Sequence, residues 1–239
     1  MAEAILGASN LVRRYASGFR LVVERLELAA GEVLCVLGPT GAGKSTLLKL
    51  LAGIEQPDSG LVSLSGAAEC GDGHVTVAYV PQRPLLLRGS VWFNLEVGLR
   101  STRVSRQQRA EAVRQVAAAL QLEGLLRRSA RALSGGQMRL VALGRALVLR
   151  PRILLVDEPT ADLDPGRGAR VEQVLLDVAR QRRVGIVWTT HNLFQARRVA
   201  DRVLFVCDGQ AIESGPTEHF FCSPQQPLTR RFLRGELLY

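Results

Sequence analysis

Long apolar runs, lysines and metal-binding cysteine pairs are scarce or absent in this sequence of 239 residues. No apolar stretch approaches the roughly 18 residues of a membrane-spanning helix, so we expect no transmembrane segment. Residues 1–6 lack the basic-then-apolar pattern of a signal peptide, which favours a cytosolic protein. The four cysteines have no metal-ligand spacing, and Cys35 and Cys207 lie in strand-like apolar runs, which is typical of reduced core thiols.

Arginine supplies nearly all of the formal net charge of +9, because Lys44 and Lys49 are the sole lysines. A basic chain is compatible with nucleic acid or an anionic membrane surface as a partner. The arginines are scattered along the chain instead of being gathered in one run. This distribution favours a bias toward arginine on a solvated surface, with proximity to a membrane as the alternative. We expect no nucleic-acid partner.

The pattern of apolar residues predicts an α/β fold. A hydrophobic content of 47% and the chain length suit one large α/β domain with an insertion. Residues 5–37 alternate apolar and polar side chains, which predicts an antiparallel β-subdomain. Continuous apolar runs, typical of parallel strands buried on both faces, occur at 33–37, 153–156 and 184–189. They predict a parallel central sheet.

Between these runs the chain changes character. Residues 58–80 carry short strand signals with Gly-Asp-Gly turns, whereas residues 90–150 are helix-prone and show no strand signal. Helices are expected at 47–53, 108–120, 138–149, 167–181 and 193–200. We therefore divide the chain into a core with the β-subdomain (1–82 and 151–215), an inserted α-helical subdomain (83–150) and a C-terminal helical tail (216–239).

A glycine-rich stretch follows the apolar run 33–37 and leads into a helix. It reads Gly38-Pro39-Thr40-Gly41-Ala42-Gly43-Lys44-Ser45-Thr46. Glycines in such a turn let successive backbone N–H groups point at an anion, and the helix N-terminus adds the positive end of its dipole. Lys44 can reach the β- and γ-phosphates of a nucleotide, and the Ser45 hydroxyl can ligate Mg²⁺. The alternative is a turn without a ligand, but the flanking strand and helix favour nucleotide binding.

Two carboxylates follow the run 153–156, at the end of a central parallel strand where ligands bind in open α/β sheets. Asp157 can hold Mg²⁺, directly or through water. Glu158 can polarise an attacking water as a general base. A solvated pair of acids at a strand end is the alternative, and the phosphate loop argues against it.

A second anion-binding helix start is carried by Leu133-Ser134-Gly135-Gly136-Gln137. Ser134 can cap the helix, and the glycines leave N–H groups open toward an anion. Taken alone, this segment also fits an ordinary capped helix. Tyr15, at a strand end, can stack on a purine or pack within the sheet.

Together these segments resemble the nucleotide-binding subunits of ABC transporters, and the resemblance covers essentially the whole chain. The order and spacing agree for the phosphate loop, a Q-loop at Gln82, the signature 133–137, the strand 153–158, a D-loop Ala161-Asp162-Leu163-Asp164 and a switch His191. A minor difference is Asp162, which stands where small residues are common in the family.

The resemblance implies an ATPase with a P-loop NTPase core that uses ATP and Mg²⁺. It implies a head-to-tail homodimer, in which the signature of one subunit completes the ATP site of the other. The catalytic residues are then Glu158, His191 and Lys44, with Tyr15 on the adenine and Asp164 in the D-loop. The metal would be held by Ser45, Gln82 and Asp157.

Finer features are similar to the importers of tungstate and related oxyanions. These are the segment 81–91 and the ending 232–239. We expect an ATPase on the inner face of the cell membrane, docked on an integral-membrane permease that an extracytoplasmic solute-binding protein serves. Apolar residues after Gln82 are the expected permease contacts, with core packing as the alternative: Leu85, Leu86, Leu87, Trp92 and Phe93. The rival functions are an exporter or lipid-transport ATPase and a soluble DNA-repair or ribosome-associated ABC ATPase.

Overall fold

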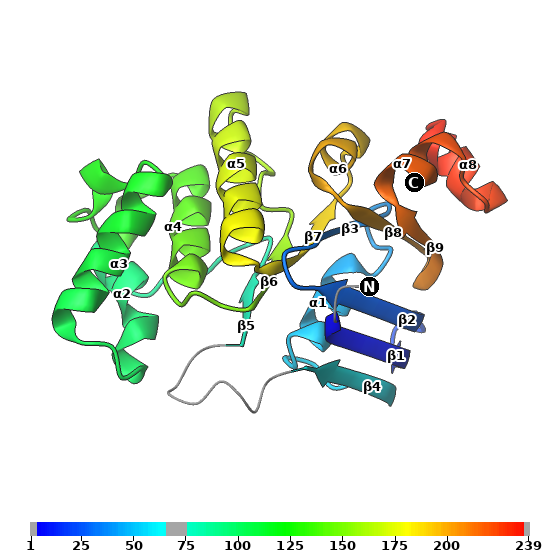
Figure 1. The fold of residues 1–239 in the computed structure, drawn as a ribbon, viewed down its shortest axis with the longest axis horizontal. Helices are drawn as coiled ribbons and strands as arrows, with labels where there is room; N and C mark the ends of the chain where they lie inside the picture. The colour runs from blue at the N-terminus through cyan, green and yellow to red at the C-terminus, as the bar shows by residue number, and fades with distance from the viewer. Residues whose placement is uncertain (1–3, 66–75, 237–239) are drawn as a thin grey trace.

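The computed structural model describes residues 4–65 and 76–236 of the chain (Figure 1). Within these residues a nine-stranded sheet has the order β4-β1-β2-β9-β8-β3-β7-β6-β5. The strands are β1 (Ala4–Arg14), β2 (Arg20–Ala29), β3 (Val33–Leu37), β4 (Ser59–Leu64), β5 (Val77–Val80), β6 (Ile153–Asp157), β7 (Gly185–Thr190), β8 (Arg202–Cys207) and β9 (Gln210–Pro216). The Gly-Asp-Gly turn expected at 71–73, and Cys70, lie outside the described residues.

The sheet has two parts with different pairing, as the alternating and continuous apolar patterns predict. Strands β5, β6, β7, β3 and β8 pair in parallel, and every side chain of β3 and β6 is buried. Strands β1, β2 and β4 pair antiparallel. Along β2, buried side chains largely alternate with more exposed ones. Strand β9 pairs antiparallel with β8, and a single parallel pair, Val22 with Gln210, links β9 to β2, so that the two parts form one sheet.

Helices cover the parallel strands and build the segment between β5 and β6 (Figure 1). They are α1 (Lys44–Leu51), α2 (Val91–Glu96), α3 (Arg106–Ala119), α4 (Gly135–Leu147), α5 (Pro165–Arg182), α6 (Leu193–Val199), α7 (Thr217–Cys222) and α8 (Pro227–Leu233), with 3₁₀ turns at Val97–Ser101, Glu123–Leu125 and Ala130–Ala132. An isolated bridge between Ser90 and Ser129 adds a β contact within this otherwise helical segment.

Four helices begin two or three residues earlier than the apolar periodicity predicts. Helix α1 begins directly after Gly43, α3 after Ser105, α4 after Ser134 and α5 after Asp164. The side chains of Ser134 and Asp164 each accept a hydrogen bond from the first helical turn. Because periodicity marks only the buried face, the capping residue sets the start of a helix more accurately.

The core lies on both faces of the sheet, and successive residues of β6 face opposite sides. Leu154 and Val156 pack with the helices α2–α6, whereas Ile153 and Leu155 pack with α1, β1 and β2. The helical segment therefore shares one continuous hydrophobic core with the parallel strands. Of the described helices, none is long and apolar enough to cross a membrane.

Candidate nucleotide site

A cavity of about 480 Å³ opens where the parallel strands end and α1 begins. It is lined by Tyr15, Ser17, Phe19, Thr40, Gly41, Gly43, Lys44, Ser45, Thr46, Gln82, Asp157, Glu158 and His191. The chain thus brings together residues from positions 15 to 191, as expected for the carboxyl edge of a parallel sheet. Of the expected nucleotide-binding residues, Gly38, Pro39 and Ala42 support the loop without lining this cavity.

Glycine is required at two points of the phosphate loop. Gly43, which precedes α1, has a φ of 103°, a backbone conformation that other residues rarely adopt. At Gly38 a Cβ would overlap the carbonyl oxygen of Val206. The loop therefore folds tightly between β3 and α1, with the N-terminus of α1 directed at the cavity.

Lys44 is a buried cation beside two carboxylates. Its Nζ donates to the carbonyl oxygens of Gly38 and Pro39 at 2.7 and 2.8 Å. Burial lowers the pKa of Lys44, and the nearby Glu158 and Asp157 carboxylates oppose that shift. The ammonium group is thus held within the loop where it can face an anionic ligand.

A buried threonine outside the sequence motifs contacts the Asp157 carboxylate and the Glu158 backbone. Thr189 Oγ1 donates to Asp157 Oδ1 at 2.6 Å and accepts from the backbone N–H of Glu158 at 3.0 Å. Glu158 has a φ of 47°, a left-handed conformation uncommon outside glycine. Position alone could have suggested Thr189, because it lies at the end of β7, which pairs with β6.

The Glu158 carboxylate lies between the expected Q-loop and switch residues. Its Oε1 is 2.9 Å from His191 Nδ1, and its Oε2 is 3.4 Å from Gln82 Nε2. The Glu158 side chain is largely buried, whereas the His191 side chain is 63% exposed. The arrangement holds a carboxylate in the cavity with a donor on each side, and such a carboxylate can accept a proton from water.

Tyr15 is anchored at the mouth of the cavity. Its hydroxyl donates to Glu55, which also accepts from Lys49 at 3.2 Å. The Arg13 guanidinium lies 5.1 Å from the centre of the Tyr15 ring, a cation–π distance. Phe19 lines the same cavity, with its ring centre 6.0 Å from that of Tyr15. The site therefore has an aromatic wall, of which the sequence indicated only Tyr15.

The signature segment begins α4 and does not line this cavity. Ser134 Oγ accepts from the backbone of Gln137 at 3.3 Å, and Gln137 Oε1 accepts from the backbone of Ser134 at 3.0 Å. Gly136 packs close to Leu163 of the D-loop, whereas a Cβ at Gly135 would meet open space. Figure 1 shows α4 and α1 on opposite sides of α5.

Asp164 and Asp162 of the D-loop make different contacts. Asp164 caps α5 by accepting from the backbone of Arg167 at 3.0 Å. Asp162 lies 3.4 Å from the guanidinium of Arg139, a residue of α4 that the sequence analysis did not single out. Arg139 and Asp162 line a small hollow beside Gln82.

The residues expected to hold Mg²⁺ fit a hard cation of this kind. Ser45, Gln82 and Asp157 all line the cavity and offer hydroxyl, amide and carboxylate oxygens. Among the described residues no group of three or more His, Cys, Asp or Glu side chains could hold a metal ion. With the oxygens of Ser45, Gln82 and Asp157, a cation here would complete its coordination with water and phosphate oxygens, which is the usual mode for Mg²⁺.

The fold and the cavity define a phosphate-loop nucleotide-binding protein. Residues 24–161 match the family model for the ABC transporter. The chain is 38% identical over 236 residues to the phosphate import ATP-binding protein PstB 2 of Natronomonas pharaonis, covering 91% of this chain and 83% of that protein. It is 35% identical over 213 residues to the tungstate uptake system ATP-binding protein TupC of Peptoclostridium acidaminophilum, covering 89% of this chain and 98% of that protein.

The fold agrees with a solved structure as well. A dimeric ATP-binding cassette, bound to ADP and Pi in a post-hydrolysis state, has a TM-score of 0.80 and 25% identity, over 89% of this chain and 98% of that one. The chain therefore belongs to the ABC transporter family. It is an ABC ATPase, an enzyme whose hydrolysis of ATP is coupled to transport, as the resemblance predicts.

Proposed function

We propose that this chain is the ATP-hydrolysing subunit of an importer that takes up tungstate, molybdate or a related oxyanion. The observation that carries the proposal is the convergence of the phosphate loop, Glu158, Gln82 and His191 on one cavity. Import of an oxyanion is supported by the relatives named for phosphate import and tungstate uptake.

In this proposal the cavity residues bind the nucleotide, hold the metal and activate water. The phosphate loop and Lys44 bind the β- and γ-phosphates, and Tyr15 stacks on the adenine. Glu158 accepts a proton from the attacking water, while His191 donates a hydrogen bond to the charge that develops on the γ-phosphate. Mg²⁺, held by Ser45, Gln82 and Asp157, would neutralise phosphate charge when bound. Gln82 contacts Glu158 and so is placed to respond to the γ-phosphate.

The signature segment would serve the site of a second copy in a head-to-tail homodimer. Within this chain the signature segment lies across α5 from the phosphate loop. A Cβ at Gly135 would have no neighbouring atom within 4 Å, so packing within the chain does not require glycine there. A bare glycine at a helix N-terminus leaves room for a phosphate to approach the backbone N–H groups. Asp164, as the cap of α5, would keep the D-loop in place beside this segment.

The helical segment 83–150 would act as the subdomain that meets an integral-membrane permease on the inner face of the cell membrane. Leu85 is 84% exposed and Leu87 is 46% exposed, so both are available for that contact. Leu86 and Trp92 instead pack against the main core, and only part of the expected apolar surface remains. An extracytoplasmic solute-binding protein would deliver the anion to the permease.

The test is solute-dependent ATP hydrolysis in the assembled transporter. The tagged chain is purified from its own membranes with the permease and binding protein that accompany it, and the complex is placed in proteoliposomes. We expect tungstate or molybdate on the binding protein to raise ATP turnover, with Glu158→Gln as the inactive control. Stimulation by a cation or an organic solute, and by no oxyanion, would contradict the proposed substrate class.

A further inference from the structure

The buried hydroxyl of Thr189 contacts both acidic residues at the end of β6. Thr189 is fully buried, pairs in register with Asp157 across the parallel strands β6 and β7, and does not line the nucleotide cavity. We propose that Thr189 is a positioning residue for ATP hydrolysis, which acts through Asp157 and Glu158 without touching the nucleotide. The inference rests on the roles proposed above for these two acids as metal ligand and general base.

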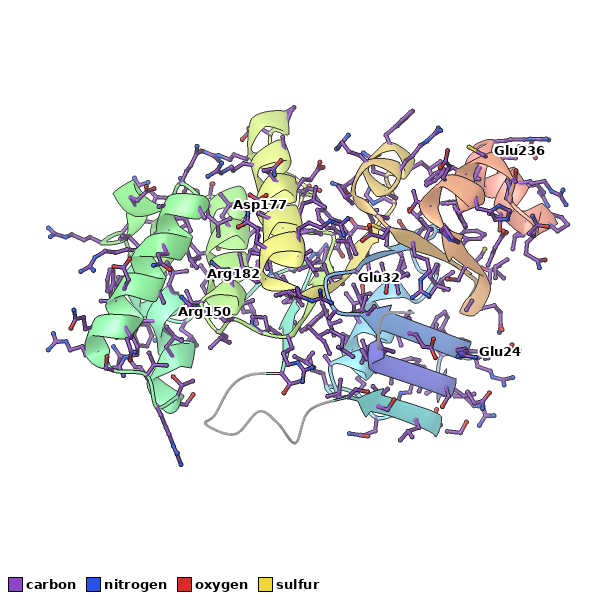
Figure 2. The ribbon with its side chains drawn as sticks, viewed as in Figure 1. Glu24, Glu32, Arg150, Asp177, Arg182 and Glu236 are labelled. Carbon is purple, nitrogen blue, oxygen red and sulfur yellow. The ribbon has the colours of Figure 1, made fainter. Side chains whose placement is uncertain are left out.

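Thr189 lies at the edge of the sheet where the parallel strands end. Figure 2 labels Arg150 and Arg182, which precede β6 and β7 and so mark the opposite edge, where these strands begin. Every residue of β7 is buried, so a polar side chain on this strand needs a hydrogen-bond partner within the protein. Asp157, itself 4% exposed, supplies the acceptor from the neighbouring strand.

The hydrogen-bond geometry assigns the hydroxyl proton of Thr189 to Asp157. The backbone N–H of Glu158 is a donor 3.0 Å from Oγ1, so Oγ1 accepts that bond. The hydroxyl proton is therefore left for Asp157 Oδ1 at 2.6 Å, a length typical of a bond to an ionised carboxylate. One oxygen of Asp157 is thus tied in place, which sets the plane of the carboxylate that lines the cavity.

The same residue supports the unusual backbone of Glu158. With a φ of 47°, Glu158 is in a left-handed conformation that persists only where the surrounding structure holds it. Its N–H is shared between two acceptors of Thr189, Oγ1 at 3.0 Å and the backbone oxygen at 3.2 Å. This conformation places the Glu158 carboxylate between His191 and Gln82. Removing the hydroxyl would therefore loosen the base as well as the metal ligand.

The next residue of β7 makes different contacts. Thr190 is also buried, but its Oγ1 donates to Gln195 Oε1 at 2.8 Å and accepts from the backbone N–H of Asn192 at 3.1 Å. Those bonds order the start of α6. Because consecutive residues of a strand face opposite sides of the sheet, the contact with the two acids belongs to position 189.

Thr189→Val tests the hydroxyl, because valine has nearly the same shape but neither donates nor accepts a hydrogen bond. We expect kcat to fall about tenfold or more, as is usual when a group that orients a metal ligand is removed. A second readout does not depend on turnover. Mn²⁺ is bound with a non-hydrolysable ATP analogue, and electron paramagnetic resonance reports the surroundings of the cation. We expect the spectrum to change in Thr189→Val, because the Asp157 carboxylate is free to turn.

Two further variants isolate the hydroxyl even where Thr189→Val folds poorly. Thr189→Ser keeps the hydroxyl and Thr189→Ala lacks it, whereas both lose the methyl group. We expect Thr189→Ser to retain most of the turnover and the wild-type spectrum, and Thr189→Ala to lose both. The matched control is Thr217→Val, which removes a hydroxyl that donates to the Ala200 carbonyl at 2.8 Å outside the nucleotide cavity. Thr217→Val should hydrolyse ATP normally, and urea unfolding checks the stability of every variant.

Equal turnover in Thr189→Ser and Thr189→Ala, or an unchanged Mn²⁺ spectrum in Thr189→Val, would overturn Thr189 as a positioning residue. Glu158→Gln separates this inference from the proposed function. Normal hydrolysis by Glu158→Gln would reject the role proposed for the base itself. An inactive Glu158→Gln beside a fully active Thr189→Val would reject only the role of Thr189.

Discussion

Arg139 of the signature helix donates a hydrogen bond from Nη2 to the backbone carbonyl of Gln82 at 2.9 Å. The same nitrogen lies 3.4 Å from Asp162 Oδ2 of the D-loop. One side chain thus joins three segments that are far apart in sequence. Arg139 is only 7% exposed, and its Nε and Nη1 are buried without a hydrogen-bond partner among the described residues.

Replacing Arg139 should therefore cost more than replacing its acidic partner. Arg139→Ala leaves the Gln82 carbonyl without a donor and opens a gap, so we expect a loss of about 1–3 kcal/mol in the free energy of unfolding. Asp162→Asn should cost less than about 1 kcal/mol, because Asp162 is 87% exposed and solvent screens the pair. Urea unfolding of both variants measures the difference, and equal losses would mean that the ion pair dominates.

Glu158→Gln should separate nucleotide binding from hydrolysis. The amide keeps the shape of the side chain but cannot accept the proton, so we expect turnover to fall by roughly 10²-fold or more while ATP still binds and holds a dimer. Size-exclusion chromatography with ATP detects that dimer. Lys44→Ala is the comparison, because loss of the ammonium group should weaken nucleotide binding itself. An ATP-bound Glu158→Gln variant with normal turnover would reject Glu158 as the base.

The shared site can be tested by placing two lesions in one dimer. If Lys44→Ala is carried by one subunit and Ser134→Arg by the other, both lesions fall in one composite site and the opposite site keeps all its residues. If one subunit carries both changes opposite a wild-type subunit, both sites are damaged. Native mass spectrometry should count more bound nucleotide in the first arrangement. Equal occupancy would contradict contribution of the signature in trans.

Leu85 is exposed and Trp92 is packed, so replacing them should have opposite effects on permease docking and on stability. Leu85→Ser should change the free energy of unfolding by no more than about 0.5 kcal/mol, because the side chain is exposed. It should nevertheless weaken permease docking and solute-stimulated turnover in the assembled transporter. Trp92→Ala should lower stability by up to about 3–5 kcal/mol, because Trp92 packs against the core. Thermal melting of the isolated subunit, followed by a pull-down with the permease, distinguishes the two effects.

The bond between Tyr15 and Glu55 predicts a measurable dependence on pH. The hydrogen bond from Tyr15, with help from Lys49, lowers the pKa of Glu55. A lowered folded-state pKa means that this stabilisation is present above the unfolded value of about 4.3 and is lost as pH falls through the folded value. Tyr15→Phe keeps the ring but removes the donor, so the Glu55 pKa should rise.

Carboxyl NMR titration of wild-type and Tyr15→Phe protein measures that pKa directly. The loss of the anchor should also raise the KM for ATP several-fold with little change in kcat, because the ring loses its fixed orientation and not its stacking face. Tyr15→Ala should raise KM further. An unchanged Glu55 pKa in Tyr15→Phe would mean that Lys49 and Arg13 hold the carboxylate without Tyr15.

Much of the fold could be predicted from local sequence because the responsible forces act locally. The run Ile153–Val156 is apolar at every position, and a strand buried on both faces requires this composition. The glycines before Lys44 permit a turn that other residues rarely adopt. The phosphate loop can therefore be predicted from the sequence alone. Ser134 and Asp164 sit directly ahead of the helices that they cap.

The relationships that depend on folding join residues far apart in the chain. Arg139 and Gln82 are separated by 57 positions, and Tyr15 and Glu55 by 40. Whether Trp92 is packed and Leu85 exposed depends on which neighbours each side chain meets, since both belong to one apolar segment. Arg152 and the end of α5 likewise line one cavity because β6 and β7 pair in parallel register. Side-chain burial and charge clustering follow from strand register and helix packing, and these are properties of the assembled chain rather than of any single segment.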